Sequence, residues 1–93
     1  MKSIKLKIKN EQGLHARPST KFVNFTDGFD GTIKVIANNE EVDGKNVMGL
    51  MLLSLGLNDE FTVVANSRIG NSADEIRILE KLKNLVEVLK FDE

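Results

Sequence analysis

The spacing of apolar residues changes repeatedly between two periods along this chain, and that alternation limits the possible folds more than any other feature. From Lys2 to Lys9 apolar and polar residues alternate strictly, which is typical of a half-buried strand. A helix is predicted next, over about Ala16–Thr26, with Asp27-Gly28 as its stop. The stripe of this helix expected to face the core is Phe22, Val23 and Phe25, with Ser19 and Thr26 flanking it.

The middle of the chain predicts a hairpin and a short helix. Two β-rich runs, Thr32–Ala37 and Glu40–Val42, are joined by Asn38-Asn39, a pair that tolerates the positive φ of a two-residue turn. Asn46 has the residue type of a helix N-cap, and the helix expected after it is apolar nearly all round. Its apolar residues are Val47, Met48, Leu50, Met51, Leu52 and Leu53.

The last third of the chain predicts one more strand and a long amphipathic helix. The strand is expected over Phe61–Asn66, where apolar residues recur at every second position. Ser72 and Glu75 have the spacing of a capping box, which predicts the start of a helix over about Ala73–Leu89. The apolar stripe of this helix is Ile76, Leu79, Leu82, Leu85, Val86 and Leu89.

The order strand, helix, strand, strand, helix, strand, helix predicts an α+β fold. Elements in this order favour a four-stranded antiparallel sheet covered on one face by three helices, which is an open-faced sandwich. A chain of 93 residues has room for one compact unit, so residues 1–93 are expected to form a single domain. A domain of this size cannot enclose a deep pocket, so its functional groups are expected on the surface.

The composition argues against several classes of function. The formal net charge is -1 and the chain has no Trp or Tyr, so it offers nucleic acid neither a basic surface nor stacking aromatics. The absence of Cys and the presence of one His argue against disulfides and a metal site. The glycines match no nucleotide-binding fingerprint, so no cofactor is expected. No apolar run approaches a membrane span, so the protein is expected to be cytoplasmic, without membrane insertion.

The only imidazole, His15, follows a turn that contains Gly13 and directly precedes the expected helix. A helix N-terminus offers unpaired N–H groups and about half a positive charge, so a phosphoryl group on His15 would find donors at Ala16 and Arg17. The guanidinium of Arg17 would add a mobile cation with paired donors. Pro18 is expected at the first helical position (N1), where it would stiffen the turn. From these residues alone, a plain surface histidine beside a solvated arginine is an alternative interpretation.

The apolar helix after Asn46 is hard to bury completely in so small a protein. Some of Val47, Met48 and Met51 are therefore expected to be exposed, as a patch on which a partner docks. The alternative interpretation is that all three side chains belong to the core.

Two segments of the chain resemble signatures of a known family. The segment Gly13–Ser19, Gly-Leu-His-Ala-Arg-Pro-Ser, is similar to the phosphorylation-site motif of the HPr family. These proteins are the histidine-containing phosphocarriers of the phosphoenolpyruvate-dependent sugar phosphotransferase system. The segment Val42–Met51 resembles the second signature of the family, and the expected element order resembles its open-faced sandwich.

The resemblance implies roles for particular residues. His15 would carry the phosphoryl group on Nδ1, receiving it from Enzyme I and delivering it to a sugar-specific Enzyme IIA domain, and Arg17 would steady the group. The residues implied to line the surface where both partners dock are Thr20, Val47, Met48 and Met51. Such a protein is expected to be a monomer in brief contact with its partners, and a stoichiometric carrier rather than an independent turnover enzyme.

The chain departs from the family pattern in places. Many members from Gram-positive bacteria have a regulatory serine at the position of Asn46, and an amide cannot be phosphorylated in that way, so no regulatory serine is expected. The segment Leu52–Gly56 is longer than usual, and the loop after it is shorter. The loop Ser67–Asn71 carries Arg68 and Ile69 where the family tends to be acidic or small.

Two other functions stay open on the sequence. A paralogous phosphocarrier of the nitrogen-related phosphotransferase chain would use the same His15 and relay phosphate to regulatory proteins. A non-carrier interaction module would keep the fold and bind regulators through Met48 and Met51, although the presence of His15 counts against that interpretation.

Overall fold

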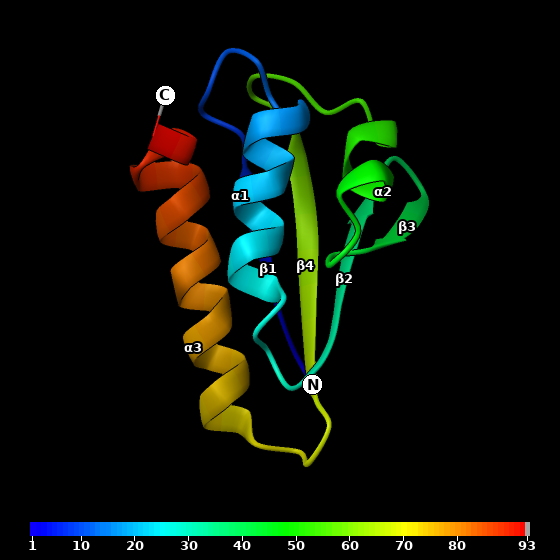
Figure 1. Cartoon of the computed structure of the whole chain (residues 1–93), viewed down its shortest axis with the longest axis vertical. Helices are drawn as coiled ribbons and strands as arrows, with labels where there is room; N and C mark the ends of the chain where they lie inside the picture. Colours follow the sequence, from blue (N-terminus) through cyan, green and yellow to red (C-terminus); the bar gives the residue numbers. More distant parts are fainter. Residues whose placement is uncertain (93) are drawn as a thin grey trace.

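The computed structural model describes residues 1–92, and its helices and strands follow the predicted order (Figure 1). The strands are β1 (Lys2–Lys7), β2 (Gly31–Ala37), β3 (Glu40–Asp43) and β4 (Glu60–Ser67). The helices are α1 (Ala16–Thr26), α2 (Val47–Leu52) and α3 (Ser72–Lys83), and two short helical segments, Asn84–Val88 and Lys90–Asp92, follow α3.

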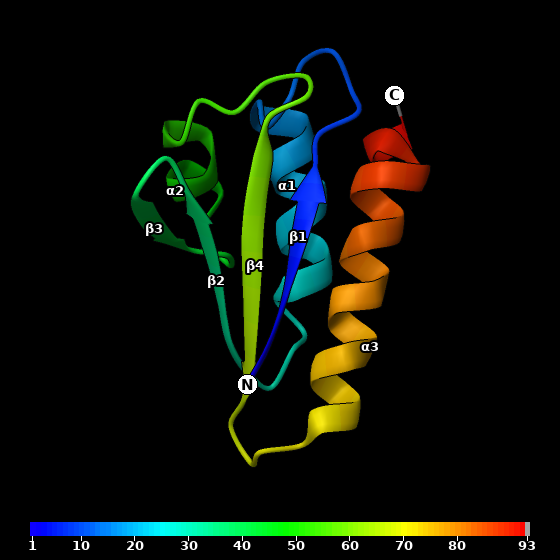
Figure 2. The same cartoon turned by 180° about the vertical axis from the view of Figure 1, so that it is seen from behind.

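The four strands form one antiparallel sheet in the order β1-β4-β2-β3. All three helices lie against one face of this sheet, with α1 between α2 and α3 (Figure 1). Seen from behind, the other face has no helix of the described chain over it (Figure 2). The predicted α+β open-faced sandwich is confirmed.

The core lies between the sheet and the helices, because alternate residues of each strand point toward the helical layer. Val63 of β4 pairs with Ile4 of β1 and with Val35 of β2, and both valines are fully buried. Phe22 of α1 meets Phe61 of β4 edge to face, with ring centroids 6.3 Å apart. Burying a side chain of this size contributes about 1.5–3 kcal/mol, so these contacts determine which face of the sheet α1 covers.

The turn between β2 and β3 is the two-residue hairpin expected from Asn38-Asn39. The φ angles of these residues are 53° and 64°, in the left-handed region that such a turn requires and that asparagine tolerates. Ala37 and Glu40 are paired directly on either side of the turn. The predicted hairpin is confirmed.

The inward stripe predicted for α1 is wrong at one position. Phe22 is fully buried, but Phe25 is 38% exposed. Two small polar residues, Ser19 and Thr26, occupy buried positions on the same helix, and the Thr26 hydroxyl donates to the Gly44 carbonyl at 2.8 Å. Because both hydroxyls are buried and hydrogen-bonded, that of Ser19 to the Leu14 carbonyl and that of Thr26 to the loop between β3 and α2, the buried side of α1 is centred away from Phe25.

The start of α3 differs from the predicted capping box. The helix begins at Ser72 and is capped by Asn71, whose side-chain oxygen accepts a hydrogen bond from the Asp74 N–H at 3.1 Å. The carboxylate of Glu75 is buried and accepts from the Ser67 N–H at 2.7 Å. The pairing of Ser72 with Glu75 is therefore wrong, because Glu75 reaches the end of β4 instead of the start of its own helix.

The C-terminal helix changes its winding, and this moves the buried stripe. A π turn spans Asn84–Val88, and the Leu89 N–H donates to its first carbonyl at 2.8 Å. A π turn takes up more residues than an α turn, so the stripe rotates and Leu89 is 42% exposed. Ile76, also predicted in the stripe, is exposed as well, whereas Ile78 is buried because the stripe begins at Glu75.

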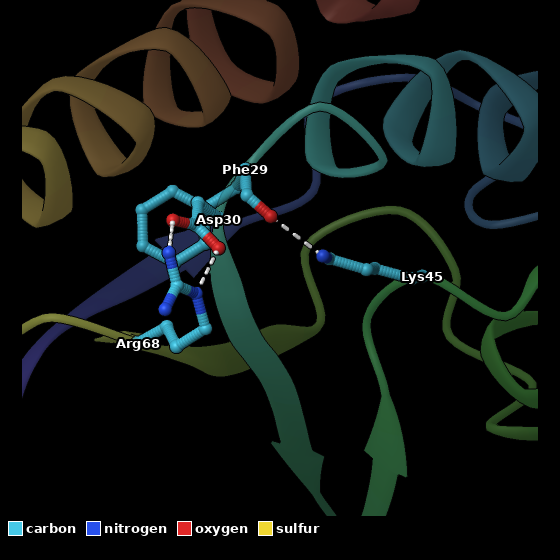
Figure 3. A network of polar contacts seen from close by, with 4 residues as sticks. All are labelled: Phe29, Asp30, Lys45 and Arg68. Carbon is cyan, nitrogen blue, oxygen red and sulfur yellow. Dashed lines mark hydrogen bonds and ion pairs between the residues drawn. The ribbon is translucent and has the colours of Figure 1, made fainter.

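A polar cluster closes the end of the sheet where β4 leads toward α3 (Figure 3). Arg68 binds Asp30 through two hydrogen bonds, from Nε to Oδ1 at 2.9 Å and from Nη2 to Oδ2 at 3.0 Å. These bonds hold the pKa of Asp30 below its usual range. The Lys45 ammonium donates to the Phe29 carbonyl at 2.7 Å. Arg68 therefore ties the loop after β4 to the residue that precedes β2.

Candidate functional site

His15 is the N-cap of α1, and it is exposed. Its backbone is extended (φ -73°, ψ -174°), and its carbonyl accepts the first helical hydrogen bond from the Ser19 N–H at 2.9 Å. Serine, threonine, aspartate and asparagine favour this position because their side chains accept from first-turn amides, whereas the His15 ring makes no such bond within residues 1–92. The ring is therefore left for another role.

The loop before His15 is held against the segment that follows α2. The Leu14 N–H donates to the Leu55 carbonyl at 3.0 Å, and the Asn10 side chain donates to the Gly13 carbonyl at 3.0 Å. Gly13 has a positive φ of 63°, and a Cβ atom at this position would overlap the Leu55 carbonyl oxygen. Only glycine fits here, so the close approach of two loops fixes the backbone that leads into His15.

The first turn of α1 presents the backbone N–H groups of Ala16 and Arg17 ahead of the first intrahelical hydrogen bond. Pro18 lies at the third helical position, so its predicted placement at N1 is wrong. Its missing N–H costs nothing there, because the first amides of a helix have no intrahelical acceptor. The two amides and the positive end of the helix dipole favour an anion at this point of the chain.

Arg17 and Thr20 are exposed on the first turns of α1. The Arg17 guanidinium forms no hydrogen bond or ion pair with any residue from 1 to 92, so its donors are available to a ligand. The Thr20 hydroxyl donates to the Ala16 carbonyl at 2.8 Å, one helical turn back. A cation with this freedom, two residues from His15, suits the oxygens of a phosphoryl group.

Helix α2 presents part of the predicted docking patch. Asn46 caps it as predicted, with its side-chain oxygen accepting from the Gly49 N–H at 3.2 Å. Met48 is 64% exposed, whereas Val47 and Met51 are half-buried. The interpretation in which all three belong to the core is therefore wrong, because Met48 faces solvent in the described structure.

A shallow hollow of about 360 Å³ joins His15 to the end of α2. Glu11 and Gln12 line it from the loop before the histidine, and Ser54 lines it from the segment after α2. Sequence reasoning did not include these three residues in the site, because Glu11 and Gln12 carry no motif of their own and Ser54 reaches His15 only through the pairing of the two loops. It also missed Leu52, which is 72% exposed but belongs to a helix that is apolar on every side.

Neither a metal-binding cluster nor a membrane-spanning helix occurs in residues 1–92. No three His, Cys, Asp or Glu side chains in this range gather closely enough to hold a metal ion. The helices in the same range are too short or too polar to cross a membrane.

The chain as a whole, and not only the histidine segment, is similar to known proteins. The family model described as PTS HPr component phosphorylation site matches residues 2–88. The phosphocarrier protein HPr of Neisseria meningitidis serogroup A is 36% identical over 81 residues, which is 87% of this chain and 85% of that protein. HPr-C-His from Thermoanaerobacter tengcongensis has a TM-score of 0.88 at 34% identity, and the match covers 100% of this chain and 98% of that one. An HPr dimer from the same organism has a TM-score of 0.70 at 32% identity, over 97% of this chain and 98% of that one.

Proposed function

Since this chain belongs to the HPr family of the phosphotransferase system, we propose that it carries phosphoryl groups between proteins on Nδ1 of His15. Enzyme I is the proposed donor, and a sugar-specific Enzyme IIA domain is the proposed acceptor. The observation that carries this proposal is the position of His15, an exposed imidazole at the start of α1 that makes no capping bond within the described chain.

Transfer requires a neutral imidazole, because only an unprotonated ring nitrogen has the electron pair that attacks phosphorus. The bond between Nδ1 and phosphorus forms while the bond between phosphorus and the donor breaks, and the donor keeps that electron pair. The other ring nitrogen, Nε2, keeps its proton during the attack and can release it to water afterwards. Delivery to the acceptor repeats these steps with His15 as the leaving group.

The groups around His15 suit the charge that such a transfer creates. The Ala16 and Arg17 amides and the Arg17 guanidinium would meet the phosphoryl oxygens, which is the electrostatic help that phosphoryl transfer needs. The ring is exposed, so the partner protein must exclude water and supply the remaining catalytic groups. This division of labour is that of a stoichiometric carrier rather than of an independent enzyme.

A small docking surface beside His15 would serve both partners in turn. We assign it to the residues implied by the family, Thr20, Val47, Met48 and Met51. The exposure of Met48 supports this assignment, because a flexible, apolar side chain can fit more than one partner. A carrier must dissociate quickly, so the contact is expected to bury less than the roughly 1,200–2,000 Å² of stable complexes.

Intact mass measured after incubation with phosphoenolpyruvate and Enzyme I tests the proposal. The native chain is expected to gain one acid-labile phosphoryl group, and a His15→Ala variant is expected to gain none. Acid lability matters because phosphohistidine is lost in acid whereas phosphoserine and phosphothreonine survive. A second HPr-family protein in the same reaction verifies that Enzyme I is active, and an unmodified native chain under that condition contradicts the proposal.

A further inference from the structure

A second hollow, of about 800 Å³, has Arg17 in its wall. Three segments line it: the loop before His15, the first turns of α1 and, distant from both in sequence, the C-terminal turn. The C-terminal turn lies beside α1 at the end where that helix begins (Figure 1). Among residues 1–92, Glu11 and Asp92 contribute the carboxylates that line this hollow. Both share the hollow with the guanidinium that the proposed function requires.

The C-terminal turn is anchored in place by its own residues. Lys90, Phe91 and Asp92 all have left-handed φ angles, of 50°, 57° and 60°, a conformation that L-residues adopt only when their surroundings enforce it. Phe91 is 3% exposed and belongs to the core, and the Asp92 N–H donates to the Leu89 carbonyl at 2.7 Å. The turn therefore holds the Asp92 carboxylate beside α1.

One side chain of α1 engages this turn. The Lys21 ammonium donates to the Phe91 carbonyl at 3.0 Å and pairs with the Asp92 carboxylate at 3.3 Å. Lys21 is four residues after Arg17, and residues with this spacing are neighbours on a helix surface, with Cβ atoms about 5–6 Å apart. Lys21 is thus one helical turn from Arg17, and both side chains line the hollow that the Asp92 carboxylate also lines.

We propose that Lys21 is a positioning residue for phosphoryl transfer, because it holds the Asp92 carboxylate and so keeps Arg17 available to the phosphoryl group on His15. A guanidinium binds a carboxylate with the same paired donors that it would offer to phosphoryl oxygens, so the two anions compete for it. Without Lys21, the anchored turn would still hold the Asp92 carboxylate in the hollow that Arg17 lines, where no other partner is shown for that carboxylate among residues 1–92. The inference rests on the proposed function of His15.

A set of variants at these positions tests the proposal through the rate at which His15 is phosphorylated. Because exposed ion pairs are weak, Lys21→Ala is expected to slow phosphorylation roughly two- to fivefold. The double variant Lys21→Ala/Asp92→Asn is expected to recover the native rate, since the competing charge is gone. Asp92→Asn alone is expected to react at the native rate, and Lys21→Ala is expected to have no effect when Arg17 is already replaced by alanine.

The rate is measured with two donors, so that docking and chemistry are separated. Enzyme I with phosphoenolpyruvate is the protein donor, and phosphoramidate is a small donor that needs no docking surface. The proposal expects the same pattern among the variants with both. Lys34→Ala is the matched control, because Lys34 also forms an exposed ion pair, with Glu41 at 3.6 Å, on the open face of the sheet. Its rate is expected to equal that of the native chain.

Several results would overturn the inference while leaving the proposed function intact. An unchanged rate in Lys21→Ala, or a loss that Asp92→Asn does not restore, shows that Lys21 does not act by holding Asp92. If Glu11→Gln, and not Asp92→Asn, restores the phosphorylation rate of Lys21→Ala, the carboxylate that competes for Arg17 is that of Glu11. If Lys21→Ala slows phosphorylation by Enzyme I but not by phosphoramidate, Lys21 acts in the docking of Enzyme I. Failure of the native chain to accept phosphate from either donor contradicts the proposed function itself.

Discussion

Gly13 is the residue on which the position of His15 depends most directly. Its positive φ and its contact with the Leu55 carbonyl are separate constraints, because the first concerns backbone strain and the second concerns space. Two other glycines separate these effects. Gly70 has a positive φ of 74° but open space around a Cβ atom, and Gly28 has open space and no positive φ.

We predict that Gly13→Ala lowers the free energy of unfolding by about 2–4 kcal/mol, since overlap with backbone adds to the strain. Gly70→Ala is expected to cost about 1 kcal/mol from strain alone, and Gly28→Ala is expected to change stability by less than about 1 kcal/mol. Urea denaturation of the three variants measures the series. If Gly13→Ala and Gly70→Ala lose the same free energy of unfolding, the Leu55 carbonyl does not restrict the loop before His15.

Asn46 carries a prediction about regulation at the same scale. Its side chain caps α2 and has no hydroxyl, so a serine-directed kinase with ATP is expected to leave the native chain unlabelled. Asn46→Ser keeps a residue that caps helices well and adds the hydroxyl, so this variant is the positive control for the kinase. Labelling of the native chain, for instance at Ser54, would be the contrary result.

At the scale of whole elements, Glu75 joins the start of α3 to the end of β4. Its carboxylate is fully buried, accepts from the Ser67 N–H at 2.7 Å, and pairs with the Met1 ammonium at 3.1 Å. The hydrogen bond from Ser67 is the main reason that the pKa of Glu75 lies below its usual range, although burial acts in the opposite direction. The contact between the two elements therefore depends on the charged form.

Acid is consequently expected to weaken this contact. The pKa of Glu75 is lower in the folded than in the unfolded chain, so the unfolded chain binds more protons as the pH falls. The stabilisation is complete above the unfolded pKa of about 4.3 and is lost as the pH falls through the lower folded value. Urea denaturation at a series of pH values is expected to show a shallower acid loss in Glu75→Gln. The pKa of Asp30 is also lowered by folding, and it contributes the same acid loss of stability to the native chain and to Glu75→Gln. If the free energy of unfolding falls equally steeply with acid in the two chains, this role of Glu75 is ruled out.

The elements also show what sequence patterns can and cannot predict. The bounds of α1 and the Asn38-Asn39 hairpin were predicted correctly, because residues that are close in sequence determine a helix stop and a tight turn. The capping box at Ser72 was predicted wrongly, because Glu75 is used by a strand that precedes the helix in sequence. A contact of that kind leaves no local pattern. His15 could be proposed as the site from its motif, whereas no pattern pointed to Lys21, because its partners are 70 and 71 residues away in sequence.

At the scale of the whole molecule, the proposed site and the Asp30–Arg68 cluster lie at opposite ends of the sheet. Helix α1 begins at one end, and the loop from β4 to α3 forms the other (Figure 1). Met48 and Ile69 have almost equal exposure, 64% and 65%, but Ile69 belongs to that distant loop. They are therefore a matched pair for testing where a partner docks.

Met48→Ala is expected to raise the KM of Enzyme I for this chain about five- to tenfold, as for a side chain that contributes a little over 1 kcal/mol to binding. Ile69→Ala is expected to leave the KM unchanged, and neither variant should alter the melting temperature appreciably, because both side chains face solvent. An equal effect of the two variants on the KM would remove the assignment of Met48 to the docking surface.

The bare N-cap of α1 has an energetic consequence for a carrier. A phosphoryl group on His15 would supply the anionic cap that the imidazole does not provide within the described chain. By thermodynamic linkage, the free energy that this cap gives to the helix is subtracted from the phosphoryl-transfer potential of the protein. A cap contributes about 0.5–2 kcal/mol, which shifts the transfer equilibrium roughly two- to thirtyfold toward the loaded carrier. The start of one helix thereby sets how firmly the group is held in transit and how readily the next protein can remove it.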